Sequence, residues 1–143
     1  MSRIRTIGIR EQAAWMLSRY PAFRCEVHGG LLVCRGELQP GPVYATYKAL
    51  IEYRVGRWPK AFVPGDQLKP LEPGEKIPHT YGPDQPCLFY PNRQSWRSDM
   101  KLADKIVPWL CLWLAFYEMW RATGEWYGGG ITHGDAMEIE PAA

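Results

Sequence analysis

A strict alternation of side chains over residues 43–55 is the feature that most limits how this chain can fold. Apolar residues occupy every second position: Val43, Ala45, Tyr47, Ala49, Ile51, Tyr53 and Val55. Polar or charged side chains occupy most of the positions between them: Thr46, Lys48, Glu52 and Arg54. A period of two places the two sets on opposite faces of a β-strand. One packed face and one wet face are typical of an antiparallel sheet that is covered on a single side.

Shorter strand patterns lie on either side of this segment. Residues 23–27 alternate between apolar and charged side chains, a Gly29-Gly30 turn signal follows, and residues 31–38 have the composition of a second strand. This order predicts a β-hairpin. With a short strand near residues 61–63, the sheet is expected to be a four-stranded antiparallel meander.

Two helices are expected at the ends of the fold. Residues 9–19 carry apolar side chains at helical spacing, and Pro21 should end that helix. Residues 99–105 are expected to form a short helical turn. A second helix should begin at Pro108, because proline suits a first turn, and should run through residues 108–123. Its first half is apolar nearly all round, so it must be buried on several sides. The predicted fold class is therefore α+β.

The length and composition indicate one globular domain. The chain has 143 residues, of which 46% are apolar and 22% charged, and it contains no internal repeat. We expect a single domain over 1–143, with a core of about 9–127 and a loose tail over 128–143. The net charge of +2, from 17 basic and 15 acidic side chains, does not require a nucleic-acid partner. A basic patch that includes Arg3, Arg5 and Arg10 keeps nucleic-acid binding as a less favoured alternative.

Several function classes have little support in the sequence. The longest apolar run, residues 106–116, is shorter than the roughly 18 residues of a membrane span, and the first residues do not resemble a signal peptide. We therefore expect a cytoplasmic protein that is not bound to a membrane, with its cysteines reduced. There is no CxxC pair, and His28, His79 and His133 are far apart. No metal or other cofactor is expected.

The stretch IPHTYGPDQPCLFY, residues 77–90, places a cysteine in a proline-rich segment. Loops run over the surface, so Cys87 is expected to be an exposed thiol. Cys25, Cys34 and Cys111 fall in predicted strands or helix and are interpreted as small core hydrophobes. An exposed thiol without a disulfide partner indicates a reactive role, and an incidental loop cysteine is the alternative.

The order of elements, over about residues 9–127, resembles a ubiquitin-conjugating domain. In that family a His-Pro-Asn tripeptide is followed, after seven residues, by the catalytic cysteine and usually a leucine. Here Pro78-His79 and Cys87-Leu88 keep that spacing, although His79 stands where the family has asparagine and an isoleucine where it has histidine. The segment RWPKAFVP, residues 57–64, also resembles the family's stretch after its third strand.

The end of the chain resembles a particular branch of that family. Residues 109–133, WLCLWLAFYEMWRATGEWYGGGITH, are similar to short bacterial members encoded in CBASS antiphage operons beside cGAS-like nucleotidyltransferases. The resemblance implies a transferase that binds the C-terminus of the nucleotidyltransferase as a thioester and passes it to an amine or another acceptor. It leaves open whether an activating enzyme is needed. A non-catalytic adaptor with the same fold, which binds the nucleotidyltransferase, is the alternative.

The resemblance implies roles for Cys87 and His79, and two nearby residues, Asp84 and Asn92, are further candidates. Cys87 would be the nucleophile, and His79, by its position, would donate a hydrogen bond to the oxyanion or act as a base. A histidine that only fixes the loop backbone is the alternative. Asp84, three residues before Cys87, either orients or deprotonates an acceptor amine, or only forms a turn. Asn92 would supply an amide from the other side of the cysteine, and the position of His133 is undetermined.

Aromatic residues at the end of the chain fall into two groups. The helical spacing of one group predicts a core stripe: Trp109, Trp113, Phe116, Tyr117 and Trp120. Trp126 and Tyr127 lie beyond the predicted helix. They are the better candidates for contact with a partner.

Overall fold

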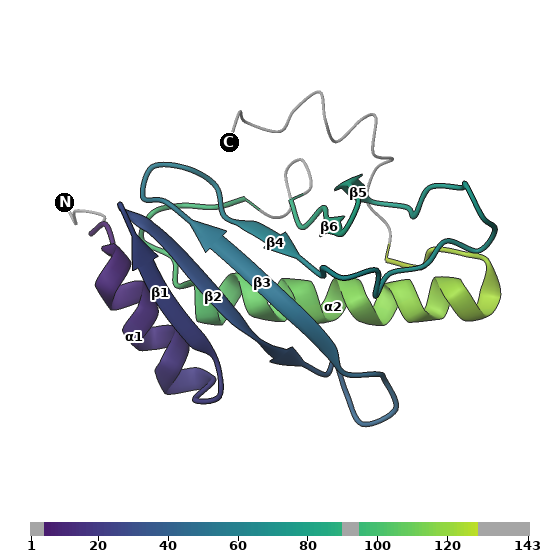
Figure 1. Ribbon diagram of the computed structural model, residues 1–143, viewed down its shortest axis with the longest axis horizontal. Helices are drawn as coiled ribbons and strands as arrows, with labels where there is room; N and C mark the ends of the chain where they lie inside the picture. Colours follow the sequence, from purple (N-terminus) through teal and green to yellow (C-terminus); the bar gives the residue numbers. More distant parts are fainter. Residues whose placement is uncertain (1–4, 90–94, 129–143) are drawn as a thin grey trace.

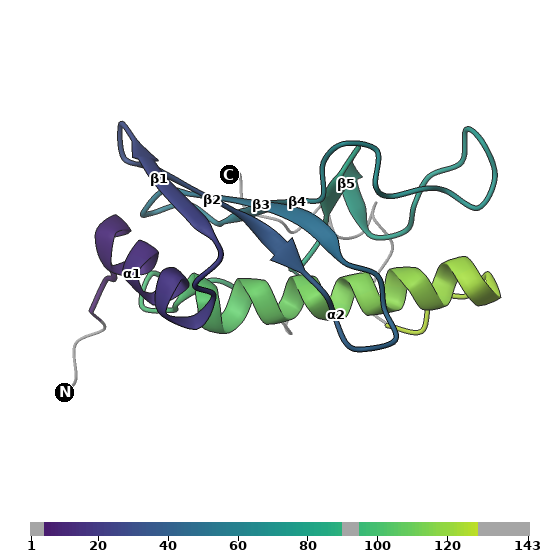
Figure 2. The ribbon, with the colours of Figure 1, turned by 60° about the horizontal axis from the view of Figure 1, so that its bottom comes forward.

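The fold has two layers, a four-stranded sheet and a long helix that lies across one of its faces (Figure 1, Figure 2). The computed structural model describes residues 5–89 and 95–128. The elements are α1 (Ile9–Arg19), β1 (Arg24–His28), β2 (Leu31–Leu38), β3 (Tyr47–Tyr53), β4 (Lys60–Phe62), β5 (Thr80–Gly82), β6 (Gln85–Pro86) and α2 (Leu102–Thr123). The predicted α+β class and the N-terminal helix are confirmed.

The sheet is the expected meander. Its strand order is β1-β2-β3-β4, and each neighbouring pair is antiparallel. In β3 every second side chain is buried, from Tyr47 to Tyr53. The strand is nevertheless shorter than the alternation over 43–55, and Val43 is 87% exposed. The reason is pairing: β2 ends at Leu38 opposite Tyr47, so the residues before Tyr47 have no strand to pair with.

Helix α2 begins earlier in the sequence than expected. It begins at Leu102 and runs through Pro108, so the predicted start at Pro108 is wrong. The helical turn expected over 99–105 is not a separate element, because residues 102–105 form the first turn of α2. Proline inside a helix removes one backbone hydrogen bond. The buried face continues without a break across Pro108, from Leu102 and Ile106 to Leu110, and this packing offsets the loss. The helix ends where expected, at Gly124, whose φ of 81° is left-handed.

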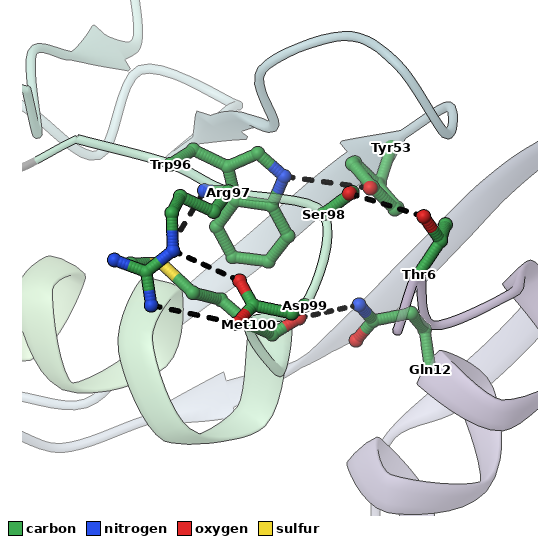
Figure 3. Close-up of polar contacts among 8 residues, drawn as sticks. All are labelled: Thr6, Gln12, Tyr53, Trp96, Arg97, Ser98, Asp99 and Met100. Atoms are coloured by element: carbon green, nitrogen blue, oxygen red, sulfur yellow. Dashed lines mark hydrogen bonds and ion pairs between the residues drawn. The ribbon is translucent and has the colours of Figure 1, made fainter. Parts of the chain in front are cut away.

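A buried glutamine connects the two helices (Figure 3). Gln12 of α1 is completely buried, and its amide Nε2 donates to the Met100 carbonyl at 2.7 Å. Its Oε1 accepts the Leu102 N–H at 2.9 Å. Leu102 is the first residue of α2, and the N-cap residue Lys101 makes no side-chain capping bond. A side chain of α1 therefore satisfies one of the N–H groups that a helix start leaves unpaired.

The core lies between the sheet and α2. It contains buried apolar residues from the sheet, from both helices and from the segment after β4, among them Met16, Leu32, Cys34, Ile51, Tyr53, Ala61, Val63, Leu102, Ile106, Leu110 and Leu114. The small β5–β6 hairpin, which the sequence did not predict, lies beside β4 (Figure 1). Within the described ranges no helix is long and apolar enough to cross a membrane.

Candidate active site

The β5–β6 hairpin brings His79 and Cys87 together. His79 immediately precedes β5 and Cys87 immediately follows β6. The Cys87 N–H donates to the His79 carbonyl at 2.8 Å. The turn between the two strands contains Asp84 in a left-handed conformation, with φ of 65°. The hairpin therefore fixes the backbone of Cys87 relative to His79.

The expected surface position of Cys87 is wrong. The residue is only 1% exposed, and its Sγ donates to the Phe89 carbonyl at 3.4 Å. It borders a cavity of about 40 Å³ that is lined by Cys87, Leu88, Trp109, Leu112, Trp113, Phe116 and Gly128. Prolines do not keep this segment on the surface: Pro86 is itself part of β6 and is buried. Cys87 and Leu88 line this cavity together with aromatic side chains of α2, and the Phe89 ring lies edge-on to that of Trp109 at 6.0 Å.

Gly128 lines this cavity and lies close to two aromatic rings. A Cβ at position 128 would lie 2.6 Å from the Phe116 ring and 2.8 Å from Nε1 of Trp126. Real Cβ atoms do not approach other atoms so closely, so only glycine fits without a shift of the backbone or of the rings. Trp126 packs inside the same site, with its ring centroid 4.9 Å from that of His79 and 5.5 Å from that of Trp113.

His79 has an unusual backbone. Its φ of 55° lies in the left-handed region, which histidine adopts more often than most residues do. Its carbonyl accepts two hydrogen bonds, one from the Cys87 N–H and one from Nε1 of Trp113 at 3.0 Å. Both bonds end on the main-chain carbonyl, so they fix the backbone at position 79 and do not distinguish the two interpretations of His79. A chemical role for its imidazole stays a prediction.

The remaining predicted site residues have different outcomes. Asp84 forms the hairpin turn, and its carbonyl accepts the Val63 N–H at 2.7 Å. A groove of about 580 Å³ runs past residues 75–84 and includes His79 and Asp84. Tyr127 is 54% exposed. Asn92, His133 and Arg3 lie outside the described residues. The proposed partner contacts of Trp126 and Tyr127 stay predictions.

The other three thiols are less readily ionised than a cysteine side chain in water. Cys34 is buried as expected, but Cys25 and Cys111 are only half-buried. Burial raises the pKa of all three thiols above the ordinary value. Cys25 and Cys34 are directly opposite each other in the β1–β2 pair, and their Sγ atoms lie 3.2 Å apart. Within the described ranges no group of three His, Cys, Asp or Glu residues is placed to hold a metal ion.

Comparison with known proteins identifies the family. A family model described as "Type II CBASS E2 protein" matches residues 12–134. The chain belongs to this family. The expected resemblance to the CBASS branch of ubiquitin-conjugating proteins is thereby confirmed, and the family supports an E2-like role in CBASS. No curated protein matches the chain closely enough to add a named relative.

Two features of this candidate site were not predicted from the sequence. Trp113 was interpreted only as part of the core stripe, yet its indole N–H reaches the backbone of the loop that holds Cys87. Gly128 was assigned to a loose tail, yet it makes close contacts beside the same cysteine. Helical spacing identifies the buried face of a helix, but it does not show where an indole N–H points. No pattern in the sequence marks either contact.

Proposed function

We propose that this protein of the Type II CBASS E2 family carries a protein C-terminus as a thioester on Cys87 and transfers it to an amine. The C-terminus of a cGAS-like nucleotidyltransferase is the proposed acyl donor. The observation that carries the proposal is the fixed backbone contact between Cys87 and His79, at the spacing expected for a conjugating site. The family match over residues 12–134 supports the same assignment.

The proposed reaction has two acyl transfers. The Cys87 thiolate attacks an activated C-terminal carbonyl, an S–C bond forms, and the activating group leaves with the bonding electrons. The acceptor amine then attacks the thioester, an N–C bond forms, and the thiolate leaves. A base takes the proton from the amine. Both steps pass through an oxyanion, for which a hydrogen-bond donor is needed within reach. The His79 imidazole is the proposed donor, and Asp84 is the proposed base or orienting group.

The burial of Cys87 adds a requirement to this mechanism. A cavity of about 40 Å³ has room for little more than one water molecule, and a peptide C-terminus needs far more. Helix α2 is held by its buried face, whereas residues 125–128 belong to no helix or strand. We therefore propose that residues 125–128 move aside before Cys87 reacts.

The proposal is tested by co-expression with the nucleotidyltransferase from the same operon. Wild-type protein should form a conjugate that thiol reductant removes on a denaturing gel. Cys87→Ser should form an oxyester that resists thiol reductant, because the alkoxide is a poorer leaving group than a thiolate. Serine is chosen because position 87 is buried and a larger charged side chain would destabilise the fold. Cys87→Ala should form no conjugate, and Cys111→Ala, at another cysteine, should behave like wild type.

The results separate the enzyme from the adaptor. A conjugate that persists in Cys87→Ala contradicts the assignment of Cys87. Co-purification with the nucleotidyltransferase without any conjugate, even when an activating enzyme is supplied, supports the adaptor. The adaptor is kept as a second candidate because Cys87 is 1% exposed, which is the opposite of what an open thioester site requires.

A further inference from the structure

We infer that Trp113 is a positioning residue for Cys87, and this inference rests on the proposed function. The indole Nε1–H of Trp113 donates to the His79 carbonyl at 3.0 Å, and the same oxygen accepts the Cys87 N–H at 2.8 Å. A carbonyl oxygen has two lone pairs, so both bonds form at once. The single oxygen thus ties the two ends of the β5–β6 hairpin to α2.

The indole is well placed to act as a fixed anchor. Trp113 is 3% exposed, and its ring stacks on Tyr117 with centroids 5.7 Å apart and planes 7° apart. Tyr117 is itself fixed, because its hydroxyl accepts the Lys69 N–H at 2.7 Å. These contacts do not involve residues 125–128, so they persist when that segment moves aside. The N–H therefore keeps its direction when the loop moves.

The loop is the part that needs an anchor. His79 has a left-handed backbone, a conformation that persists in residues other than glycine only where the surroundings hold it. Its carbonyl direction sets the position of the Cys87 N–H and thereby the position of the thiol. Loss of the Trp113 N–H would leave the carbonyl with one donor and the hairpin with one fewer connection to α2. Cys87 would then sample open positions more often and hold its reactive position less often.

Two substitutions at position 113 separate the hydrogen bond from packing. Trp113→Phe keeps an aromatic ring but has no donor. Trp113→His keeps a five-membered ring in which Nε2 occupies the place of the indole Nε1, although it fills less space. A packing role makes histidine the worse substitution, whereas a hydrogen-bonding role makes phenylalanine the worse one. Trp120→Phe is the matched control, since Trp120 is also buried in α2, at 5% exposure.

The first measurement needs no partner protein. Folded protein is treated with iodoacetamide, and peptide mapping gives the alkylation rate of Cys87 relative to Cys25. We expect Trp113→Phe to raise this ratio about two- to tenfold, as the loss of one hydrogen bond implies, and Trp113→His to restore it toward wild type. Trp120→Phe should leave it unchanged. The inference is overturned if Trp113→Phe and Trp120→Phe give equal alkylation ratios. It is also overturned if Trp113→His changes the ratio more than Trp113→Phe does. If phenylalanine at 113 unfolds the protein and histidine does not, the hydrogen bond is supported, and the reverse overturns it.

The second measurement follows conjugate formation against donor concentration. Positioning by Trp113 predicts a lower maximal rate in Trp113→Phe with an unchanged half-saturating concentration, and no change in Trp120→Phe. If Trp113→Phe changes only the half-saturating concentration of the donor, the positioning role of Trp113 is overturned. If the wild type forms no conjugate, the proposed function fails, and the alkylation ratio alone then decides whether Trp113 anchors the loop.

Discussion

Replacement of Gln12 by leucine should destabilise the protein far more than replacement of an exposed glutamine. Leucine has nearly the same size but cannot bond the Met100 carbonyl or the Leu102 N–H, which lie 2.7 and 2.9 Å from the amide. Each buried backbone group left without a partner costs about 1–3 kcal/mol. The added apolar surface of leucine offsets part of this. We expect a loss of about 2–5 kcal/mol from the free energy of unfolding, against a typical total of about 5–15 kcal/mol.

The measurement is urea unfolding followed by tryptophan fluorescence. Gln39→Leu is the matched control, because the Gln39 amide also donates to a carbonyl, that of Tyr44 at 2.9 Å, but does so on the surface. That control should change the stability by less than about 0.5 kcal/mol. Equal urea midpoints and slopes in Gln12→Leu and Gln39→Leu would refute a stabilising connection between the helices through the buried amide. Retained thermal cooperativity in both proteins would show that the comparison is between folded states.

Two further predictions concern the loop and the sheet. In the conjugation assay, His79→Ala should slow acyl discharge by about 100- to 1000-fold, whereas His79→Asn, which tolerates a left-handed backbone and keeps a donor, should retain most of the rate. Equal rates in the alanine variant and the wild type would leave His79 with its backbone role alone. Mild oxidation with diamide should join Cys25 to Cys34, because their Sγ atoms already lie 3.2 Å apart. Peptide mapping would refute this if Cys25 were joined instead to Cys87.

Local patterns in the sequence predicted most of the fold. The alternation in β3, the helical spacing of α1 and the stop at Gly124 each depend on residues that are close in sequence. The same is true of the β1–β2 hairpin, whose turn has two glycines. In each case the interactions that determine the element act between residues a few positions apart, so the local sequence was enough to predict it.

The errors arose where a distant segment decides the outcome. The start of α2 depends on Gln12, 90 residues before Leu102, and no local capping signal marks it. The burial of Cys87 depends on aromatic rings of α2 and on the close approach of Gly128, neither of which a proline-rich local sequence reveals. The spacing of His79 and Cys87 was visible in the sequence only through the family resemblance. Their backbone contact could not be predicted, because it depends on the β5–β6 hairpin, which the sequence did not reveal.

The position of the β5–β6 hairpin has a consequence for the solubility of the protein. The hairpin lies along the outer edge of β4, where the Val63 N–H donates to the Asp84 carbonyl. A bare sheet edge presents unpaired N–H and C=O groups on which another chain can add a strand. At the opposite edge, β1 carries the charged residues Arg24 and Glu26, which disfavour such pairing. A motion that lifted the hairpin off β4 would expose a template for self-association, whereas the proposed movement of residues 125–128 leaves this edge covered.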